Sequence, residues 1–504
     1  MSFKQKLDKF FGISERNSSI STEIIAGVVT FLAMAYILTV NPNQIVGAGD
    51  PRWSSVFIAT ALGAIVGTLL MAFLAKLPLA QAPGMGLNSM VGGLVAGYGA
   101  FHCTYGNAMF MVLVSGVLFL LLSILTIKGV SIRELIFDGI PECIRKAISV
   151  GIGLFIAYIG FQNCGLIIHN AFTQVGLIDF SSWVDQIVNV GSGASVTPAA
   201  PLVCLFGVIV IAILEHFHVK GSVIIGILAA TVLGIPLGIT SWNSSVSWNF
   251  IENFKDFFSM DPDKGGFLAA FTNGLDWDFA FSSENGNPAT VMGIIMTIIT
   301  FCMIDMFDTM GTVVGCCTPV GLVDENGKPV RYNKIMISDS VATCTGAIFG
   351  TSTVTTFVES GSGIAAGGRT GLTALVTAIC FLVSIFIMPV IASIPSAAAS
   401  SALVFVGCLM VKGAVNLKVT NVKEAVASFF TIALMPLAYS ITTGIGFGLL
   451  VYVVISVFCY VIEAIKYACT KDKENATKPV WDVSVVAIIV SILFIVYFFV
   501  PTSF

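Results

Sequence analysis

The chain is divided into fourteen apolar segments separated by short polar ones, and this pattern constrains its fold more than any other feature. Most segments approach the ~20 residues that a helix needs to cross a bilayer core. Only 10% of the 504 residues are charged, where a soluble domain has about 25%. The sequence therefore predicts an all-α polytopic membrane protein and excludes a water-soluble fold. The segments are 22–40, 53–75, 86–98, 107–127, 143–162, 200–215, 221–240, 288–317, 335–350, 359–368, 370–394, 401–415, 424–440 and 442–467.

The Lys and Arg residues are distributed unevenly between the two ends of these segments. If the N-terminal tail, residues 1–21, is cytoplasmic, all but three of the 24 Lys and Arg residues fall on that side, the exceptions being Arg52, Lys255 and Lys264. The positive-inside rule requires such an asymmetry. We therefore expect a multi-pass protein of the cell membrane with a cytoplasmic N-terminus. The larger loops expected from this orientation are external at 163–199 and 241–287 and internal at 318–334.

Nucleic-acid, metal and cofactor functions find no support in the sequence. The net charge is −4 and no basic run is present, whereas nucleic-acid binding needs a concentrated Lys and Arg surface. The 12 cysteines form no CxxC pair, so we interpret them as small buried apolar residues. We expect no metal, no cofactor and no nucleic-acid partner; the surrounding partner is the lipid bilayer.

Two features near the ends of the chain bear on helix boundaries. Ser21, Thr22 and Glu23 begin the first segment and are expected to cap its helix, where a carboxylate is favourable. A further apolar stretch, 483–500, follows the polar residues 468–480. The sequence leaves open whether this stretch crosses the membrane or packs against the other segments.

The two short segments, third and tenth in order, predict an internal repeat. The third is preceded by Gln81–Asn88, where one Pro and two Gly interrupt a helix, and the tenth by Gly350–Phe357, a Thr and Val run that favours extended backbone. Each reads as a short strand that leads into a half-helix. Seven spans separate them, and an odd number per repeat inverts the second copy, so we expect a 7+7 inverted repeat. Gly and Pro that merely allow close helix packing are the alternative.

Carboxylates within the apolar segments are the candidate functional groups. Asp305 and Asp308 are three residues apart in segment eight and are expected to face one cavity, and Glu359 opens segment ten. Charges in the membrane are costly and are interpreted as functional. The alternative is a buried ion pair, for which Arg369 at the end of segment ten is the nearest cation. Asn88, just after the Pro and Gly break, can both donate and accept hydrogen bonds.

Several motifs, in this order, resemble those of one transporter family. They are TFLAMAYI at 30–37, NP at 41–42, APGMGLN at 82–88, FDTMGT at 307–312, GTSTVTT at 350–356 and AAGGRTGLTA at 365–374. The chain resembles the hypoxanthine/adenine/guanine permeases of the nucleobase:cation symporter-2 group, AzgA-like branch, over about residues 20–470.

The resemblance implies the uracil-transporter-like fold, with a core domain that moves against a gate domain. It also implies a homodimer through the gate domain. The implied parts are an N-terminal tail at 1–21, core at 22–127, gate at 143–240, external loop at 241–287, core at 288–394, gate at 401–467 and C-terminal tail at 468–504.

The same resemblance implies a purine site made by Asn88, Asp305 and Glu359, with Asp308 tied to proton coupling. The chemistry of the residues agrees, because a purine edge with ring N–H donors complements a carboxylate and adjacent backbone N–H groups. Glu359 with the N–H groups of Ser360 and Gly361 is expected to form such a unit and to take part in proton coupling.

We therefore expect a proton-coupled importer of purine bases, with Na⁺ as an alternative coupling ion. A transporter of uracil or xanthine, or an anion exchanger on the same fold, is the rival interpretation. An intramembrane aspartyl protease is disfavoured, because its two carboxylates must lie on different helices and Asp305 and Asp308 share one.

Overall fold

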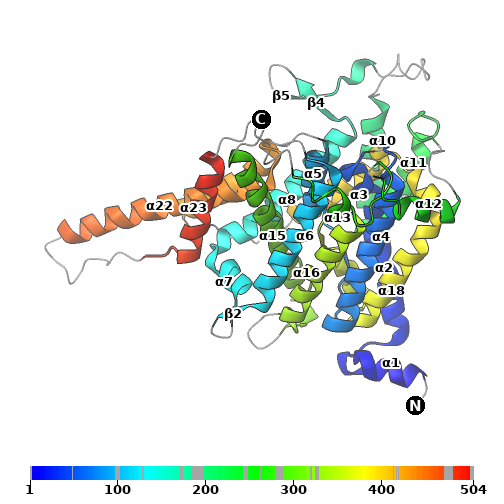
Figure 1. The fold of residues 1–504 in the computed structure, drawn as a ribbon, viewed down its shortest axis with the longest axis horizontal. Coiled ribbons are helices and arrows are strands. Elements are labelled where there is room, and N and C mark those ends of the chain that lie inside the picture. The colour runs from blue at the N-terminus through cyan, green and yellow to red at the C-terminus, as the bar shows by residue number, and fades with distance from the viewer. Residues whose placement is uncertain are drawn as a thin grey trace.

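The computed structural model describes most of the chain, and this part is almost entirely helical (Figure 1). Three two-stranded antiparallel sheets accompany the helices: β1 (Gln81–Pro83) with β6 (Val354–Thr356), β2 (Thr126–Ile127) with β3 (Val130–Ser131), and β4 (Ile167–Asn170) with β5 (Gln174–Leu177). The described residues are 3–47, 49–96, 103–127, 130–170, 174–182, 198–219, 221–241, 248–261, 263–277, 288–317, 320–323, 329–411, 414–415, 417, 419, 421–469 and 481–499.

Eight helical stretches in the described residues are long and apolar enough to cross a membrane, and three shorter apolar helices accompany them. The chain is therefore a multi-pass membrane protein, as predicted, while the count of fourteen spans stays a prediction. The expected loops at 163–199, 241–287 and 318–334 and the tail at 468–504 lie partly outside the described residues. The helices are α1 (Phe3–Phe11), α2 (Ile20–Met34), α3 (Ile37–Ile45), α4 (Trp53–Leu70), α5 (Met85–Val95), α6 (Tyr105–Ile124), α7 (Ile132–Gly139), α8 (Glu142–Asn163), α10 (Ala199–His216), α11 (Ser222–Gly234), α12 (Phe250–Phe257), α13 (Ala269–Thr272), α15 (Pro288–Cys317), α16 (Tyr332–Phe349), α17 (Ser360–Ala365), α18 (Gly371–Ser384), α19 (Met388–Ala392), α20 (Ser396–Val411), α21 (Val422–Leu437), α22 (Ile441–Cys469) and α23 (Val485–Phe499).

The predicted strand and half-helix pairs are present and meet each other. Strands β1 and β6 pair in register Gln81 to Thr356 and Pro83 to Val354, and each leads into a short helix, α5 or α17. Pro83 has no N–H to donate, which a two-stranded sheet tolerates at its edge. The two segments come from opposite halves of the chain and meet at the paired strands β1 and β6. We call this meeting point the crossing.

The helices pack into two groups that differ in their partners. The first helix group packs around α4 and α16 and includes the two half-helices, whereas the second packs around α8 and α20. Gly407 allows close approach within the second group, since a Cβ there would lie 2.5 Å from the Gly153 carbonyl oxygen. We name them by their members: α2, α3, α4, α5, α6, α15, α16, α17 and α18 in the first, and α8, α10, α11, α20, α21 and α22 in the second.

The apolar stretch near the C-terminus forms α23, which packs against α22 and α7 at one side of the molecule (Figure 1). A side chain at Gly446 of α22 would collide with Phe494, so this glycine allows the two helices to touch. Lys423 and Asp482 form an ion pair just before α23. The stretch therefore packs against the bundle.

The structure corrects the expected role of Glu23. Ser19 caps α2 by accepting a hydrogen bond from the Thr22 N–H at 3.2 Å. The buried Glu23 carboxylate instead accepts from the backbone N–H groups of Arg369 at 3.0 Å and Thr370 at 3.2 Å. A carboxylate stabilises free N–H groups at any nearby helix start, so Glu23 caps α18 and joins it to α2.

Candidate functional site

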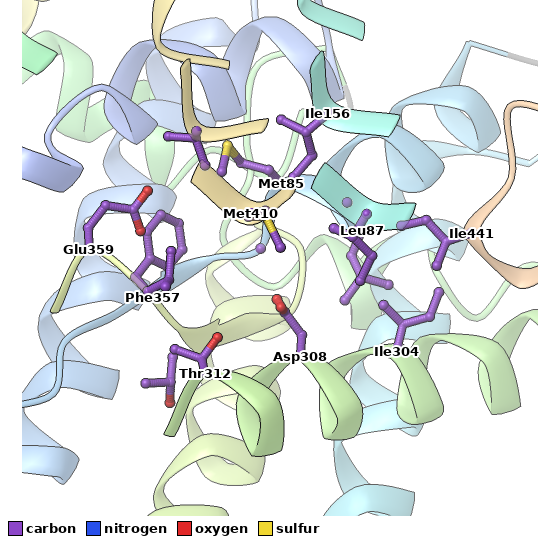
Figure 2. Close-up of a pocket in the computed structure, with 16 residues that line it drawn as sticks. Met85, Leu87, Ile156, Ile304, Asp308, Thr312, Phe357, Glu359, Met410 and Ile441 are labelled. Carbon is purple, nitrogen blue, oxygen red and sulfur yellow. The ribbon is translucent and has the colours of Figure 1, made fainter. Parts of the chain in front are cut away.

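A small cavity lies where the two helix groups meet (Figure 2). One wall comes from α5, α15 and the segment between β6 and α17, and the other from α8, α20 and α22. Its volume of about 40 Å³ holds only a few water molecules. A larger ligand therefore fits only after the two walls separate. The labelled lining residues are Met85, Leu87, Ile156, Ile304, Asp308, Thr312, Phe357, Glu359, Met410 and Ile441.

Two larger cavities approach this one from different parts of the bundle. One of 1060 Å³ is lined by the end of α3, the start of α4 and the end of α8, including Asn43, Arg52 and Asn163. The other, of 520 Å³, lies by the α10–α11 connection and is lined by Glu215 and also by Glu359. The Glu359 carboxylate thus stands between the small cavity and the 520 Å³ cavity.

Glu359 is held by a residue from the other half of the chain. The Tyr36 hydroxyl donates to Glu359 Oε1 at 2.5 Å, and Glu359 is 8% exposed. The carboxylate does not cap its own helix α17. In Figure 2 it lies beside Phe357, at the opposite side of the cavity from Ile441.

The N–H groups of Ser360 and Gly361, expected beside Glu359 as ligand donors, are engaged in the chain itself. They donate to the carbonyl oxygens of Phe357 at 3.1 Å and Val358 at 2.9 Å, because the first turn of α17 is tight. The Ser360 hydroxyl accepts from the Ala80 N–H at 3.0 Å. In this conformation both residues therefore hold α17 against the crossing.

Asp308 lines the small cavity, and Figure 2 shows it rising from α15 towards Met410. Its Oδ2 accepts a long hydrogen bond from the Thr355 hydroxyl at 3.3 Å. One residue on, the Thr309 hydroxyl accepts from the Thr356 N–H at 3.2 Å. Helix α15 is thus attached to β6 next to the carboxylate.

Asp305 does not lie with Asp308 in this cavity, contrary to the expectation for the pair. Asp305 is 1% exposed, and its carboxylate accepts from the Thr343 hydroxyl of α16 at 2.7 Å. Residues three apart on a helix point about 60° from one another. Here that angle turns Asp308 to the cavity and Asp305 to α16.

Asn88 is fully buried and does not line the small cavity. Its side-chain oxygen accepts from the Ser352 hydroxyl, which lies just before β6. Its Nδ2 has no hydrogen-bond partner among the described residues. Asn88 therefore connects the two halves of the crossing and retains an unused donor.

Sequence reasoning missed two residues of this region. Asp339 of α16 is buried behind the crossing and accepts from Gln81 Nε2 at 2.6 Å and from the Thr356 hydroxyl at 3.3 Å. The sequence feature that could have indicated Asp339 is the presence of a carboxylate inside the apolar segment 335–350. Tyr36 lies in the motif at 30–37, but no sequence pattern indicates where its hydroxyl points.

The buried ion pair considered as an alternative is not formed with Arg369. Its guanidinium donates to the carbonyl oxygens of Ile364 at 2.6 Å and Gly368 at 2.7 Å. The ion pairs resolved among the described residues lie elsewhere, as Arg52–Asp50 does. Asp308 and Glu359 therefore bring two carboxylates to a cavity without the cation that was considered for them.

The chain is similar in sequence to known permeases. Residues 21–447 match the family described as "Permease family". Adenine permease AdeQ of Escherichia coli (strain K12) is 34% identical over 451 residues, which is 90% of this chain and 90% of that protein. Guanine/hypoxanthine permease PbuO of Bacillus subtilis (strain 168) is 34% identical, covering 88% of this chain and 93% of that protein.

Solved structures show the same fold. The transmembrane domain of a cyanobacterium bicarbonate transporter, BicA, aligns with a TM-score of 0.56 at 16% identity, covering 83% of this chain and 95% of that one. SLC26A9 aligns with a TM-score of 0.53 at 12% identity, covering 90% of this chain and 69% of that one. The fold, the family match and the relatives agree, and the chain belongs to the permease family as a membrane transporter rather than an enzyme.

Proposed function

We propose that the protein imports purine bases by proton symport, with substrate bound at the small cavity between the two helix groups. The observation that carries this proposal is the pair of carboxylates, Asp308 and Glu359, on one wall of that cavity. The relatives named adenine and guanine/hypoxanthine permeases support purines as the substrate class. The plasma membrane of the cell is the proposed location.

Glu359 is the proposed contact for the base. A neutral purine presents ring N–H donors at its edge, and an ionised carboxylate is a strong acceptor for them. Phe357 lines the same cavity beside Glu359, and its ring offers a face on which a planar base stacks. The Ile156 and Met410 side chains of the second helix group then cover the base from the opposite wall.

The other proposed site residues act from behind the cavity wall in this conformation. Asp305 is turned to α16, and Asn88 is engaged with Ser352. We propose that both residues reach the base only when the crossing shifts. The unused Asn88 Nδ2 would then be a donor suited to a purine carbonyl. Ser360 and Gly361 fix α17 so that Glu359 keeps its place.

Coupling is proposed to reside in Asp308, with Glu359 contributing. A carboxylate that alternates between ionised and protonated forms can carry a proton with each transport cycle. Asp308 lies close enough to the base site to sense occupancy, because both carboxylates line one cavity. Na⁺ in place of H⁺ is the alternative, and a pH gradient without a Na⁺ gradient distinguishes the two.

Transport requires the two walls to move apart. The cavity of 40 Å³ is closed by residues from both helix groups, so we propose that the first helix group is the core domain and the second the gate domain, and that one slides against the other. The tail at 1–21 is proposed to be cytoplasmic, and the 520 Å³ cavity beside the α10–α11 connection is proposed to lie on the same side of the membrane. A homodimer through the gate domain is also proposed.

An anion exchanger is the main rival, since the similar solved structures include a bicarbonate transporter. That likeness, at 16% identity, concerns the fold alone. Two carboxylates at a cavity repel an anion and suit a neutral donor. The purine proposal is therefore the one that the side chains favour.

Uptake of radiolabelled hypoxanthine into vesicles containing the purified protein tests the proposal. A proton gradient should drive accumulation, and unlabelled guanine and adenine should compete while uracil and bicarbonate do not. Vesicles with Glu359→Gln protein are the control. Uptake that uracil or bicarbonate suppresses, or no purine uptake at all, would contradict it.

The proposed orientation has its own test. In a protein depleted of native cysteines, a cysteine at Lys264 should react with an external, membrane-impermeant maleimide, whereas one at Lys334 should react only after the membrane is permeabilised. The opposite labelling pattern would show that the protein has the reverse orientation in the membrane.

A further inference from the structure

The hydrogen bond between Tyr36 and Glu359 joins the two halves of the chain at the proposed base site. The hydroxyl donates to Glu359 Oε1 at 2.5 Å, and the two residues are separated by 323 positions in the sequence. Tyr36 is 4% exposed. This distance lies at the short end of the range for O–H···O hydrogen bonds, so the contact restrains the carboxylate.

The position of Tyr36 explains why its hydroxyl is fixed. Tyr36 lies at the break between α2, which ends at Met34, and α3, which begins at Ile37. Its own carbonyl oxygen accepts from the Val40 N–H at 3.0 Å, which holds the backbone of the break. The ring belongs to the buried hydrophobic core of the bundle. A tyrosine has few rotatable bonds, so a packed ring leaves its hydroxyl a single position.

The bond also selects which carboxylate oxygen remains for a ligand. Glu359 opens α17 but does not cap it, although a helix start attracts a carboxylate. Tyr36 therefore draws the side chain away from its own helix, towards α2 and α3. With Oε1 engaged by the hydroxyl, Oε2 is the oxygen that a base at the cavity would meet.

We propose that Tyr36 is a positioning residue that orients Glu359 so that it offers one acceptor oxygen to a ring N–H of the base. This inference rests on the proposed function and adds a determinant of specificity to it. A carboxylate fixed in one orientation distinguishes a base with N–H at that edge from one whose nitrogen is methylated. A carboxylate free to rotate distinguishes them less well.

The test compares hypoxanthine binding to wild type and Tyr36→Phe by calorimetry on purified protein. Phenylalanine keeps the ring, so packing is preserved and only the hydroxyl is lost. We expect Tyr36→Phe to lose about tenfold in affinity, as for one hydrogen bond to a charged group. Its preference for hypoxanthine over N-methylated hypoxanthine should also be smaller than that of wild type. The matched control is Tyr105→Phe, which removes another buried hydroxyl of the same helix group, bonded to the Gly350 carbonyl oxygen. It should leave affinity and preference unchanged.

A second comparison separates positioning from a general structural effect. Aspartate at position 359 is one methylene shorter and is not expected to reach the Tyr36 hydroxyl. In a Glu359→Asp background, Tyr36→Phe should therefore change the remaining affinity less than twofold, because residues that act through one another are not additive.

Three results would overturn the inference: wild-type affinity and preference in Tyr36→Phe, an equal loss in Tyr105→Phe, or an equal loss from Tyr36→Phe in both backgrounds. Wild-type protein that binds no purine would instead overturn the proposed function.

Discussion

The two strand and half-helix segments share one fold and differ in what they present to the cavity. Segment β1–α5 has a half-helix of 11 residues and contributes Met85 and Leu87 to the lining, while its polar Asn88 turns to Ser352. Segment β6–α17 has a half-helix of six residues that begins just after Glu359. The inverted repeat therefore builds the same backbone twice but places a cavity-lining carboxylate on only one copy.

Removing the carboxylate from the second segment should have the largest effect. In Glu359→Gln an NH₂ group replaces one acceptor oxygen, and a donor then faces the donor of the base. We expect purine binding to weaken by about 2–5 kcal/mol, as when one partner of a buried charged hydrogen bond is lost. Glu359→Asp remains an acceptor and should retain weak binding. Calorimetry on the purified variants checks both.

A matched control for this substitution is Glu215→Gln, since Glu215 lines the 520 Å³ cavity and accepts from the Ser222 hydroxyl at 2.6 Å. It should leave purine affinity within a factor of two. Equal losses of purine affinity in Glu215→Gln and Glu359→Gln would show that any carboxylate near the cavities affects binding. That result would contradict the special role given to the carboxylate of the β6–α17 segment.

The next largest effect should be on transport without an effect on binding. Asp308→Asn mimics a protonated carboxyl that cannot release its proton. It should bind hypoxanthine but fail to accumulate it, losing a driving force of about 2.3 kcal/mol per charge moved through 100 mV. Calorimetry and vesicle uptake on the same preparation measure the two properties. Full accumulation driven by a pH gradient would assign coupling to Glu359 or Asp305 instead.

Local sequence predicted the two strands and their half-helices, but neither the pairing of β1 with β6 nor the direction of each side chain. Pro83 and the run of Thr and Val before α17 restrict the local backbone conformation, so both strands could be predicted from the sequence. Asp308 and Glu359 were found because carboxylates are conspicuous in apolar segments. The separation of Asp305 from Asp308 depends on which helices lie on either side of α15, which is a tertiary property. The Tyr36 contact across the chain is of the same kind.

Substitution in the first segment should act mainly on stability. Asn88→Ala and Ser352→Ala each remove one partner of a buried hydrogen bond between the two segments. Each should lower the free energy of unfolding by about 1–3 kcal/mol and weaken purine binding less than Glu359→Gln does. Thermal melting and calorimetry measure the two effects. Unchanged melting of both variants would contradict a stabilising role for this hydrogen bond.

The smallest effect concerns two glycines within α17. A Cβ at Gly363 would lie 1.9 Å from the Thr30 hydroxyl oxygen and 2.8 Å from the Ala26 carbonyl oxygen, whereas at Gly361 the nearest atom is Cys316 Sγ at 3.9 Å. Overpacking costs about 1–3 kcal/mol, and alanine recovers about 0.5–1 kcal/mol of helix propensity.

Gly363→Ala should therefore lower the melting temperature of the purified protein, and Gly361→Ala should maintain or raise it. Equal melting of the two variants would show that α17 is not packed against α2 as described.

The proposed hydrogen bond from a ring N–H of the base to the Glu359 carboxylate is tested most directly by changing the base and the residue together. Hypoxanthine and its N-methylated forms should be titrated into wild type and Glu359→Gln, with competition used for weak binding. We predict that methylating one ring nitrogen weakens binding to wild type by about tenfold or more, as for a lost charge-assisted hydrogen bond, but leaves the residual binding to Glu359→Gln unchanged. An equal loss in both proteins for every methylated form would contradict the contact.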